Sequence, residues 1–151
     1  MSTMEPVAAG DEPRASTGEP TPVWREPVTE LTDPSPAVAR RAVADAAART
    51  NLGRREIDGL VLGVSEVVAN AYLHGAPPVH VEIHVAIEAV EVRVSDAGRG
   101  PDDLAVGDGV VAPDAPSGRG LWLARRSCAE VALLTDSAGF SVRLRARERP
   151  A

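Results

Sequence analysis

The chain contains no lysine, and all 16 of its basic residues are arginines. A Walker-type phosphate loop needs a lysine that reaches the nucleotide phosphates, so that chemistry is excluded. Any phosphate bound by this protein must be held by arginine, by backbone N–H groups or through a metal ion.

Cysteine is nearly absent as well. The single Cys128 rules out an internal disulfide, and no cysteine spacing suited to a metal site exists. No apolar run approaches the length of a membrane span, and the N-terminus lacks the basic and apolar segments of a signal peptide. We therefore expect a cytoplasmic protein without a membrane partner.

Aromatic residues make up only 3% of the chain, so aliphatic side chains must fill the core. The 44% of hydrophobic residues is typical of a folded globular protein. The net charge of −6 and the lack of a clustered basic stretch argue against nucleic acid as a partner.

The length of 151 residues corresponds to about one domain. Residues 1–22 are rich in Pro, Gly, Ser, Thr and Glu and hold few large apolar residues, which predicts a disordered N-terminal tail. We expect one folded domain over residues 23–147 and a short C-terminal tail over residues 148–151.

Two helices are marked by their terminal residues. Ser35 is a good N-cap and Pro36 is tolerated at the first helical position, so a helix is predicted from there to about Thr50. A second helix is predicted over Arg54–His74, with Gly75 as its stop. The apolar face expected to pack on a sheet holds Ile57, Leu60, Val61, Val64, Val68, Ala71 and Tyr72.

Alternating apolar and polar side chains predict strands, and glycine and proline mark a long loop that is expected to be functional. The predicted strands are 23–28, 79–87, 90–96, 130–135 and 140–146, with turns at Glu88-Ala89 and Ser137-Ala138-Gly139, a loop over 97–118 and a third helix over 120–129. This order predicts an α+β two-layer sandwich, with a mostly antiparallel sheet covered on one face by three helices.

Several polar residues and glycines stand out from these patterns. Glu66, Asn70 and His74 follow at four-residue steps on the polar side of the second helix, where Gly59 and Gly63 indicate a need for room. In the strand that follows, Asp96 falls on the side of the buried valines, where a carboxylate needs a hydrogen-bond partner.

Three motifs occur in a fixed order: Glu66 to Gly75 (EVVANAYLHG), Asp96 to Gly100 (DAGRG) and Gly118 to Leu121 (GRGL). Together they resemble the GHKL (histidine-kinase-like) ATPase superfamily, whose nucleotide-binding core is the Bergerat fold. The resemblance covers about residues 23–147 and is strongest to the stand-alone branch of anti-sigma factors with serine-kinase activity.

The resemblance assigns roles to three of these residues. Asn70 matches the magnesium ligand, and an amide oxygen suits Mg²⁺. Glu66, one helical turn earlier, matches the general base that takes a proton from an attacking hydroxyl. Asp96 matches the acceptor of a hydrogen bond from the adenine amino group. The alternatives are a solvated helix face for Glu66 and Asn70, and a turn-capping role for Asp96.

Further ATP contacts follow from the same resemblance. Gly98 and Gly100 let the backbone approach the base, and Ser141 stands where the family often has a threonine that reaches adenine through water. The third motif places backbone N–H groups and a helix N-terminus against the phosphates. Its residues are Gly118, Arg119, Gly120 and Leu121. Ordinary loop glycines and a plain helix start are the alternatives.

The remaining reactive residues have simpler interpretations. His80 and His84 are separated by roughly 13 Å along an extended strand, so they cannot bind one metal and are expected at the surface. Cys128 is expected to be a small buried residue rather than a nucleophile. His74 is interpreted as a helix-end residue.

The resemblance implies an ATP-binding regulatory protein that transfers the γ-phosphate of Mg-ATP to a serine on a STAS-domain anti-sigma antagonist. In its other state it would hold a sigma factor, and a homodimer is expected. The alternative is a nucleotide-gated protein-binding module without kinase activity. The catalytic half of a sensor histidine kinase is disfavoured, because no helical dimerisation segment with an acceptor histidine precedes residue 23.

Overall fold

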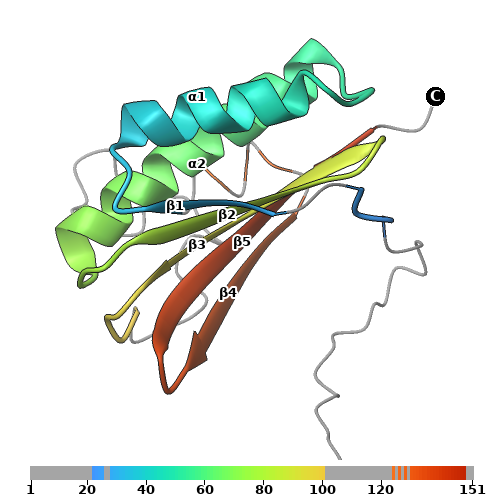
Figure 1. Cartoon of the computed structure of the whole chain (residues 1–151). Coiled ribbons are helices and arrows are strands. Elements are labelled where there is room, and N and C mark those ends of the chain that lie inside the picture. Colours follow the sequence, from blue (N-terminus) through green and yellow to red (C-terminus); the bar gives the residue numbers. More distant parts are fainter. Residues whose placement is uncertain are drawn as a thin grey trace, which may run out of the picture.

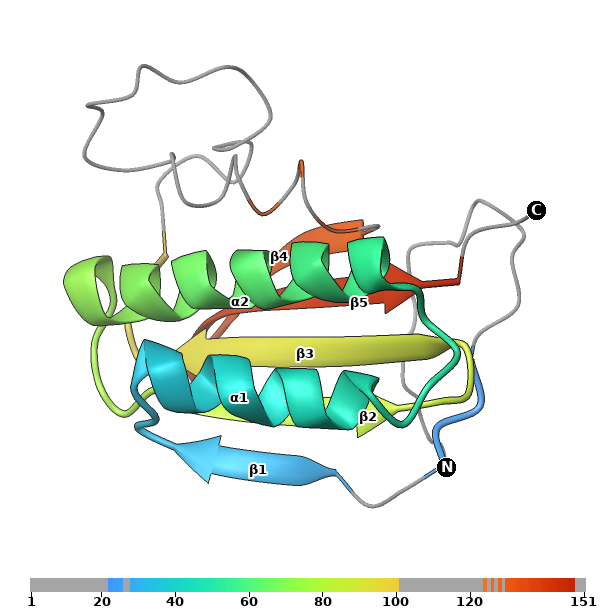
Figure 2. The ribbon, with the colours of Figure 1, turned by 90° about the horizontal axis from the view of Figure 1, so that it is seen from above.

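The computed structural model describes residues 22–25, 28–100, 124, 126, 128 and 130–148. They form two layers, in which two helices cover one face of a five-stranded antiparallel sheet (Figures 1 and 2). The elements are β1 (Thr29–Thr32), α1 (Pro36–Ala47), α2 (Arg54–His74), β2 (His80–Val85), β3 (Ala89–Asp96), β4 (Glu130–Asp136) and β5 (Gly139–Arg147). The predicted α+β two-layer class is confirmed.

Helix α1 begins as predicted and ends earlier. The Ser35 hydroxyl accepts a hydrogen bond from the backbone N–H of Val38 at 3.1 Å, which satisfies one free donor of the first turn. The predicted end at Thr50 is wrong, because α1 stops at Ala47. Beyond it the Arg49 and Thr50 N–H groups donate to carbonyls three residues earlier, at 3.1 Å each, so the last turn tightens. The Thr50 hydroxyl also donates to the Ala47 carbonyl at 2.6 Å and accepts from the Leu52 N–H at 3.1 Å.

Helix α2 has the predicted bounds and rests on the sheet through Leu60, Val64 and Val68, which are fully buried. Tyr72 departs from the prediction, since 44% of it is exposed. Its hydroxyl donates to the Pro34 carbonyl at 2.8 Å and so ties the end of α2 to the start of α1. Partial desolvation and, next, the negative charge of Asp33 raise the pKa of Tyr72, which keeps it a donor.

The sheet has the order β1-β2-β3-β5-β4, and each neighbouring pair is antiparallel. The predicted first strand at 23–28 is displaced, because the strand that pairs with β2 is Thr29–Thr32. In the β2–β3 turn, the Ala86 N–H donates to the Ala89 carbonyl at 2.9 Å. Ala89 therefore opens β3 instead of lying in the turn, and Ile87 is left 47% exposed, against its predicted inward position.

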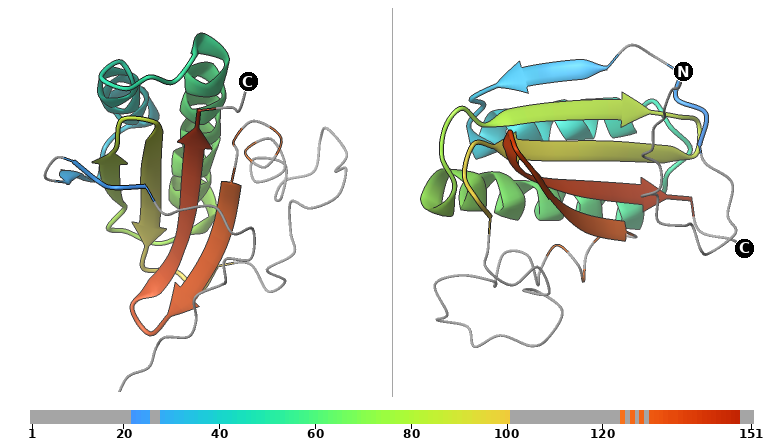
Figure 3. Two further views of the ribbon diagram at one scale, coloured as in Figure 1. Left: turned by 90° about the vertical axis from the view of Figure 1, so that its right-hand side faces the viewer. Right: turned by 90° about the horizontal axis from the view of Figure 1, so that it is seen from below.

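The core lies between α1, α2 and the helix-covered face of the sheet. Alternate residues of each central strand are buried there, as the sequence alternation predicts. We call the opposite side, turned away from both helices, the outer face (Figure 3). Its described positions are mostly polar or charged, and among the described residues no helix covers it.

Part of the predicted architecture lies outside the described residues. Of the third helix, predicted over 120–129, Ala124 and Arg126 are helical, and the Cys128 N–H donates to the Ala124 carbonyl at 2.9 Å. Most of the predicted loop over 97–118 is likewise not described. In the part of the chain that is, no helix has the length and apolar character needed to cross a membrane.

Gly63 of α2 makes room for protein packing. A Cβ built on it would lie 2.7 Å from the Cys128 sulfur and 3.1 Å from the Leu144 Cδ2, so Cys128 and Leu144 fill the space beside the helix. Burial raises the pKa of the Cys128 thiol to about 12, which keeps it protonated and unreactive at neutral pH. Cys128 is half-buried and packs against the core, which confirms the prediction of a small packing residue in part.

We expect Gly63→Val to lower the free energy of unfolding by about 1–3 kcal/mol, because the added methyl groups overpack this contact. Urea unfolding followed by circular dichroism measures the change. Gly59→Ala on the same helix is the control, and it should keep or raise stability because alanine favours helix more than glycine does. Equal stability of Gly63→Val and wild type would contradict the packing role.

Candidate nucleotide site

The structure brings the first two motifs together at one end of the molecule. The end of α2 and the end of β3 lie side by side, joined by a hydrogen bond from the Ala97 N–H to the Ala76 carbonyl at 2.8 Å. Asn70 lies near the end of α2 and Asp96 is the last residue of β3, so the first two motifs meet where these elements end. The two motifs are not neighbours in the sequence, since the whole of β2 lies between them, so it is the fold that brings them together.

Asp96 is the best-defined polar group of this region. It is only 8% exposed and lies on the helix-covered side of β3, as strand parity predicts. Its Oδ1 accepts hydrogen bonds from the Gly98 N–H at 2.7 Å and the Ala76 N–H at 3.3 Å. Within the described part of the chain, Oδ2 has no hydrogen-bond partner. A buried carboxylate with one oxygen fixed and one open is suited to accept a hydrogen bond from a ligand.

Glycines allow the backbone to approach this carboxylate. A Cβ on Gly75 would run into the Asp96 carboxyl group, and one on Gly98 would lie 2.8 Å from its Oδ1. Gly100 has a φ of +79°, which favours glycine, and a Cβ there would collide with the Phe140 ring. Gly98 and Gly100 of the second motif are thus required by the local geometry around Asp96 and Phe140.

Glu66 and Asn70 lie on consecutive turns of α2, and both are half-buried. Residues at this spacing have Cβ atoms about 5–6 Å apart on one helix face. Neither side chain has a hydrogen bond or ion pair among the described residues, so both are available to a ligand. His74, one turn further, is exposed at the end of the helix, which agrees with its interpretation as a helix-end residue.

Ser141 lies on the other face of the sheet from the Asp96 carboxylate, although both residues line one hollow. On β5 the inward positions are Phe140, Val142 and Leu144, and Ser141 alternates with them onto the outer face. Phe140 is the direct register partner of Asp96 and is 9% exposed, so an aromatic ring occupies the place sought for a hydroxyl. Sequence reasoning missed Phe140 because only the long-range pairing of β3 with β5 places it there.

The third motif lies outside the described residues. Its positions are Gly118, Arg119, Gly120 and Leu121, so its expected contacts with phosphates remain predictions. The site that can be described consists of the Asp96 region and the polar face of α2.

The donor set fits a magnesium ion that arrives with its nucleotide. Among the described residues, no three His, Cys, Asp or Glu side chains gather as a metal cluster. Asn70 offers a single amide oxygen, which has no hydrogen-bond partner in the described part of the chain. Mg²⁺ commonly takes one or two protein oxygens and completes its shell with phosphate oxygens and water.

Comparison with known proteins gives the family. The model of the histidine kinase-like ATPase domain matches residues 30–146. The chain therefore belongs to the histidine kinase-like ATPase family, the GHKL class of ATP-binding domains, as its three motifs indicate. No curated protein matches the chain.

A solved structure shows the same fold. The RsbU and RsbW domains of Rv1364c from Mycobacterium tuberculosis align with a TM-score of 0.58 and 22% identity over 83% of this chain. The chain spans 34% of that structure, so the likeness concerns a part of it. The histidine kinase domain of the E. coli osmosensor EnvZ aligns with a TM-score of 0.45 and 17% identity, over 89% of this chain and 94% of that one.

Gly75→Ala tests the geometry around Asp96. The added methyl group would displace the carboxylate, so we expect ATP affinity to fall about tenfold or more, in line with the loss of a hydrogen bond to a charged group. Isothermal titration calorimetry measures the affinity, and circular dichroism checks the fold. Gly53→Ala is the control, because there the Cβ would meet only the flexible Glu56 side chain. Unchanged affinity in Gly75→Ala would count against this site.

Proposed function

We propose that the chain is an ATP-dependent regulator that binds Mg-ATP between the end of α2 and the end of β3. It transfers the γ-phosphate to a serine of a STAS-domain anti-sigma antagonist. The observation that carries this proposal is the junction of the end of α2 with the end of β3, where two backbone donors fix Asp96 Oδ1 and Oδ2 has no partner among the described residues. Membership in the histidine kinase-like ATPase family supports ATP as the ligand.

Asp96 selects the base in this proposal. The Gly98 and Ala76 N–H groups fix Oδ1, which leaves Oδ2 to accept a hydrogen bond from an exocyclic amino group such as that of adenine. A carbonyl at the same place, as in guanine, would face an acceptor and leave a buried polar group unpaired. The site therefore favours adenine over guanine nucleotides.

Asn70 and Glu66 have different roles in phosphate transfer. Asn70 would hold Mg²⁺ through its amide oxygen, and the ion supplies charge neutralisation at the phosphates. Glu66 lies one turn away and takes the proton of the attacking serine hydroxyl. The serine oxygen forms a bond to the γ-phosphorus, the bond from that phosphorus to the β,γ-bridging oxygen breaks, and ADP leaves with the electron pair.

The partners in this proposal come from the resemblance to anti-sigma factors. A sigma factor is the partner held in one state, a STAS-domain antagonist is the phosphate acceptor, and the chain acts as a cytoplasmic homodimer. The fold likeness to a structure that includes an RsbW domain agrees with this proposal, while its 22% identity concerns the fold alone.

Asn70→Ala should weaken Mg²⁺-dependent ATP binding about tenfold or more, because the metal loses its protein oxygen ligand. The readout is ATP affinity with magnesium and with EDTA, and the difference between the two conditions should shrink in the variant. Asp58→Ala, which removes an exposed polar side chain from the same helix, is the control. A wild-type magnesium dependence in Asn70→Ala would overturn the assignment.

Glu66→Ala should leave ATP affinity near wild type and reduce serine phosphotransfer by about 100-fold or more, which is the usual contribution of a general base. The measurement is transfer of label from γ-labelled Mg-ATP to STAS-domain proteins of the same organism. Label on one of them that is lost in Glu66→Ala supports the kinase. Full transfer by the variant removes Glu66 as the base, and intact ATP binding without any transfer by wild type favours the nucleotide-gated binding module.

A further inference from the structure

The outer face has two ends that differ in how their charges are paired. At the end near residues 22–25, the Trp24 ring lies 5.7 Å from the His84 ring and 5.7 Å from the Arg145 guanidinium. Arg145 also donates two hydrogen bonds to Glu91, at 2.6 and 3.1 Å, and lies 3.5 Å from Glu130. Arg145 is thus surrounded by two acids and an aromatic ring.

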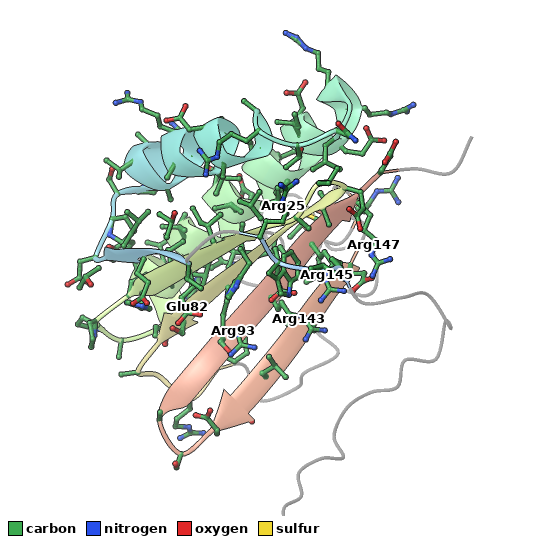
Figure 4. All side chains as sticks on the ribbon, turned by 45° about the vertical axis from the view of Figure 1, so that its right-hand side comes forward. Arg25, Glu82, Arg93, Arg143, Arg145 and Arg147 are labelled. Carbon is green, nitrogen blue, oxygen red and sulfur yellow. The ribbon has the colours of Figure 1, made fainter. Side chains whose placement is uncertain are left out.

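At the other end, two arginines face each other without such partners. Arg93 on β3 and Arg143 on β5 are direct register partners, and both are half-buried (Figure 4). Neither has a hydrogen bond or ion pair among the described residues. Like charges directly opposite on neighbouring strands destabilise a sheet. The fold therefore keeps a repulsive pair that nothing in the described structure neutralises.

The acid best placed to pair with Arg93 is turned elsewhere. Glu82 faces Arg93 in the β2–β3 register, yet its carboxylate lies 3.9 Å from His80 and 3.7 Å from His84. No contact within ion-pair distance joins Glu82 to Arg93 in the described structure. Glu82 therefore does not neutralise Arg93 in this structure.

Two hydroxyls complete the cluster. Ser95 and Ser141 form the next register pair on the same face, and neither hydroxyl has a hydrogen-bond partner among the described residues. We call these four side chains the outer-face quartet: Arg93, Ser95, Ser141 and Arg143. A hollow of about 310 Å³ opens here, lined by Arg93, Ser95 and Ser141, and Arg143 lies just outside its lining as the register partner of Arg93.

The acids that line the same hollow already have partners. Asp136 accepts hydrogen bonds from the Ala138 and Gly139 N–H groups at 2.8 and 3.1 Å. Asp96 accepts from two backbone donors on the inner side, and Glu82 lies beside the two histidines. Each of these acids has at least one partner, although Asp96 Oδ2 stays open, whereas the guanidinium and hydroxyl donors of the quartet lack acceptors among the described residues.

We propose that the outer-face quartet binds a phosphate monoester group. Two guanidinium forks and two hydroxyls offer donors from two strands, and a tetrahedral dianion has enough acceptor oxygens to meet them and to neutralise both arginines. A single carboxylate would be satisfied by one guanidinium and would leave the other unpaired. The group is carried either by a phosphorylated protein side chain or by a small molecule, and the same donors serve both.

This site lies on the opposite face of the sheet from α2, which carries Glu66 and Asn70. Asp96 also lines the hollow, but its carboxylate accepts hydrogen bonds on the inner side. The inference therefore does not depend on ATP binding or on kinase activity, and Asn70→Ala should leave it intact.

The test is a titration of the full chain with inorganic phosphate, followed by the amide chemical shifts of ¹⁵N-labelled protein at constant ionic strength. We expect saturable shifts in β3 and β5, and an affinity at least tenfold weaker in the double variant Arg93→Gln/Arg143→Gln. Arg41→Gln, an exposed arginine on α1, and Asn70→Ala are the controls and should bind as wild type does. Absence of shifts in β3 and β5, or equal affinity in the double variant, overturns the proposal.

A second arm uses a short phosphoserine peptide and its unphosphorylated form. Tighter binding of the phosphopeptide than of inorganic phosphate identifies a protein-borne group, and weaker binding identifies a small molecule.

Thermal unfolding separates a binding role of the two arginines from a structural one. Arg143→Gln without phosphate should melt at or above the wild-type temperature, because repulsion is relieved, and phosphate should raise the midpoint of wild type only. A lower midpoint in Arg143→Gln, together with an unchanged phosphate effect, would show a structural role and overturn the inference.

Discussion

The two hydrogen bonds to Asp96 Oδ1 join the helical layer to the sheet at the end where the motifs meet. One comes from Ala76, just past the end of α2, and the other from Gly98, just past the end of β3. Because both donors are backbone groups, the carboxylate orients two chain segments as well as itself. Gly75 must be a glycine for the same reason, since the carboxylate occupies the space of a side chain there. The backbone segments that surround Asp96 thus set the geometry of the proposed base-binding site.

The two faces of the sheet distribute polar groups differently. The inner face is aliphatic, as the scarcity of aromatic residues requires, and its one buried acid at the end of β3 is Asp96 among the described residues. The outer face carries arginines, acids and hydroxyls in cross-strand pairs. Since adjacent residues of a strand point to opposite faces, Ser95 and Asp96 belong to different sites although they are neighbours in the chain.

Local signals predicted much of this structure. The bounds of α2 follow from its terminal residues and its apolar spacing, and the inward position of Asp96 follows from strand parity. Tyr72 departs from the prediction because its hydroxyl reaches the Pro34 carbonyl instead of the core. This contact joins residues far apart in sequence and depends on how the two helices are placed in three dimensions. The early end of α1 is a local effect, in which Thr50 bonds to Ala47 within one turn.

The features of the site that could not be predicted from the sequence also depend on long-range pairing. Whether Ser141 or Phe140 faces Asp96 depends on the register of β5 against β3, which joins residues more than 40 positions apart. A shift of one residue would exchange the two side chains between faces. The unpaired arginines were not predicted either, because Arg93 and Arg143 are distant in sequence and meet only in the folded sheet. By contrast, the glycines around Asp96 were recognisable from their motifs.

The half-buried thiol of Cys128 has a practical consequence. Because burial raises its pKa to about 12 and its sulfur packs against Gly63, we expect the chain's one native cysteine to react slowly with maleimides and disulfide reagents while the protein stays folded. A cysteine introduced on the outer face or on the polar side of α2 can therefore be labelled selectively without first replacing the native one. Spectroscopic probes can thus be attached at either face of the sheet in an otherwise unmodified chain.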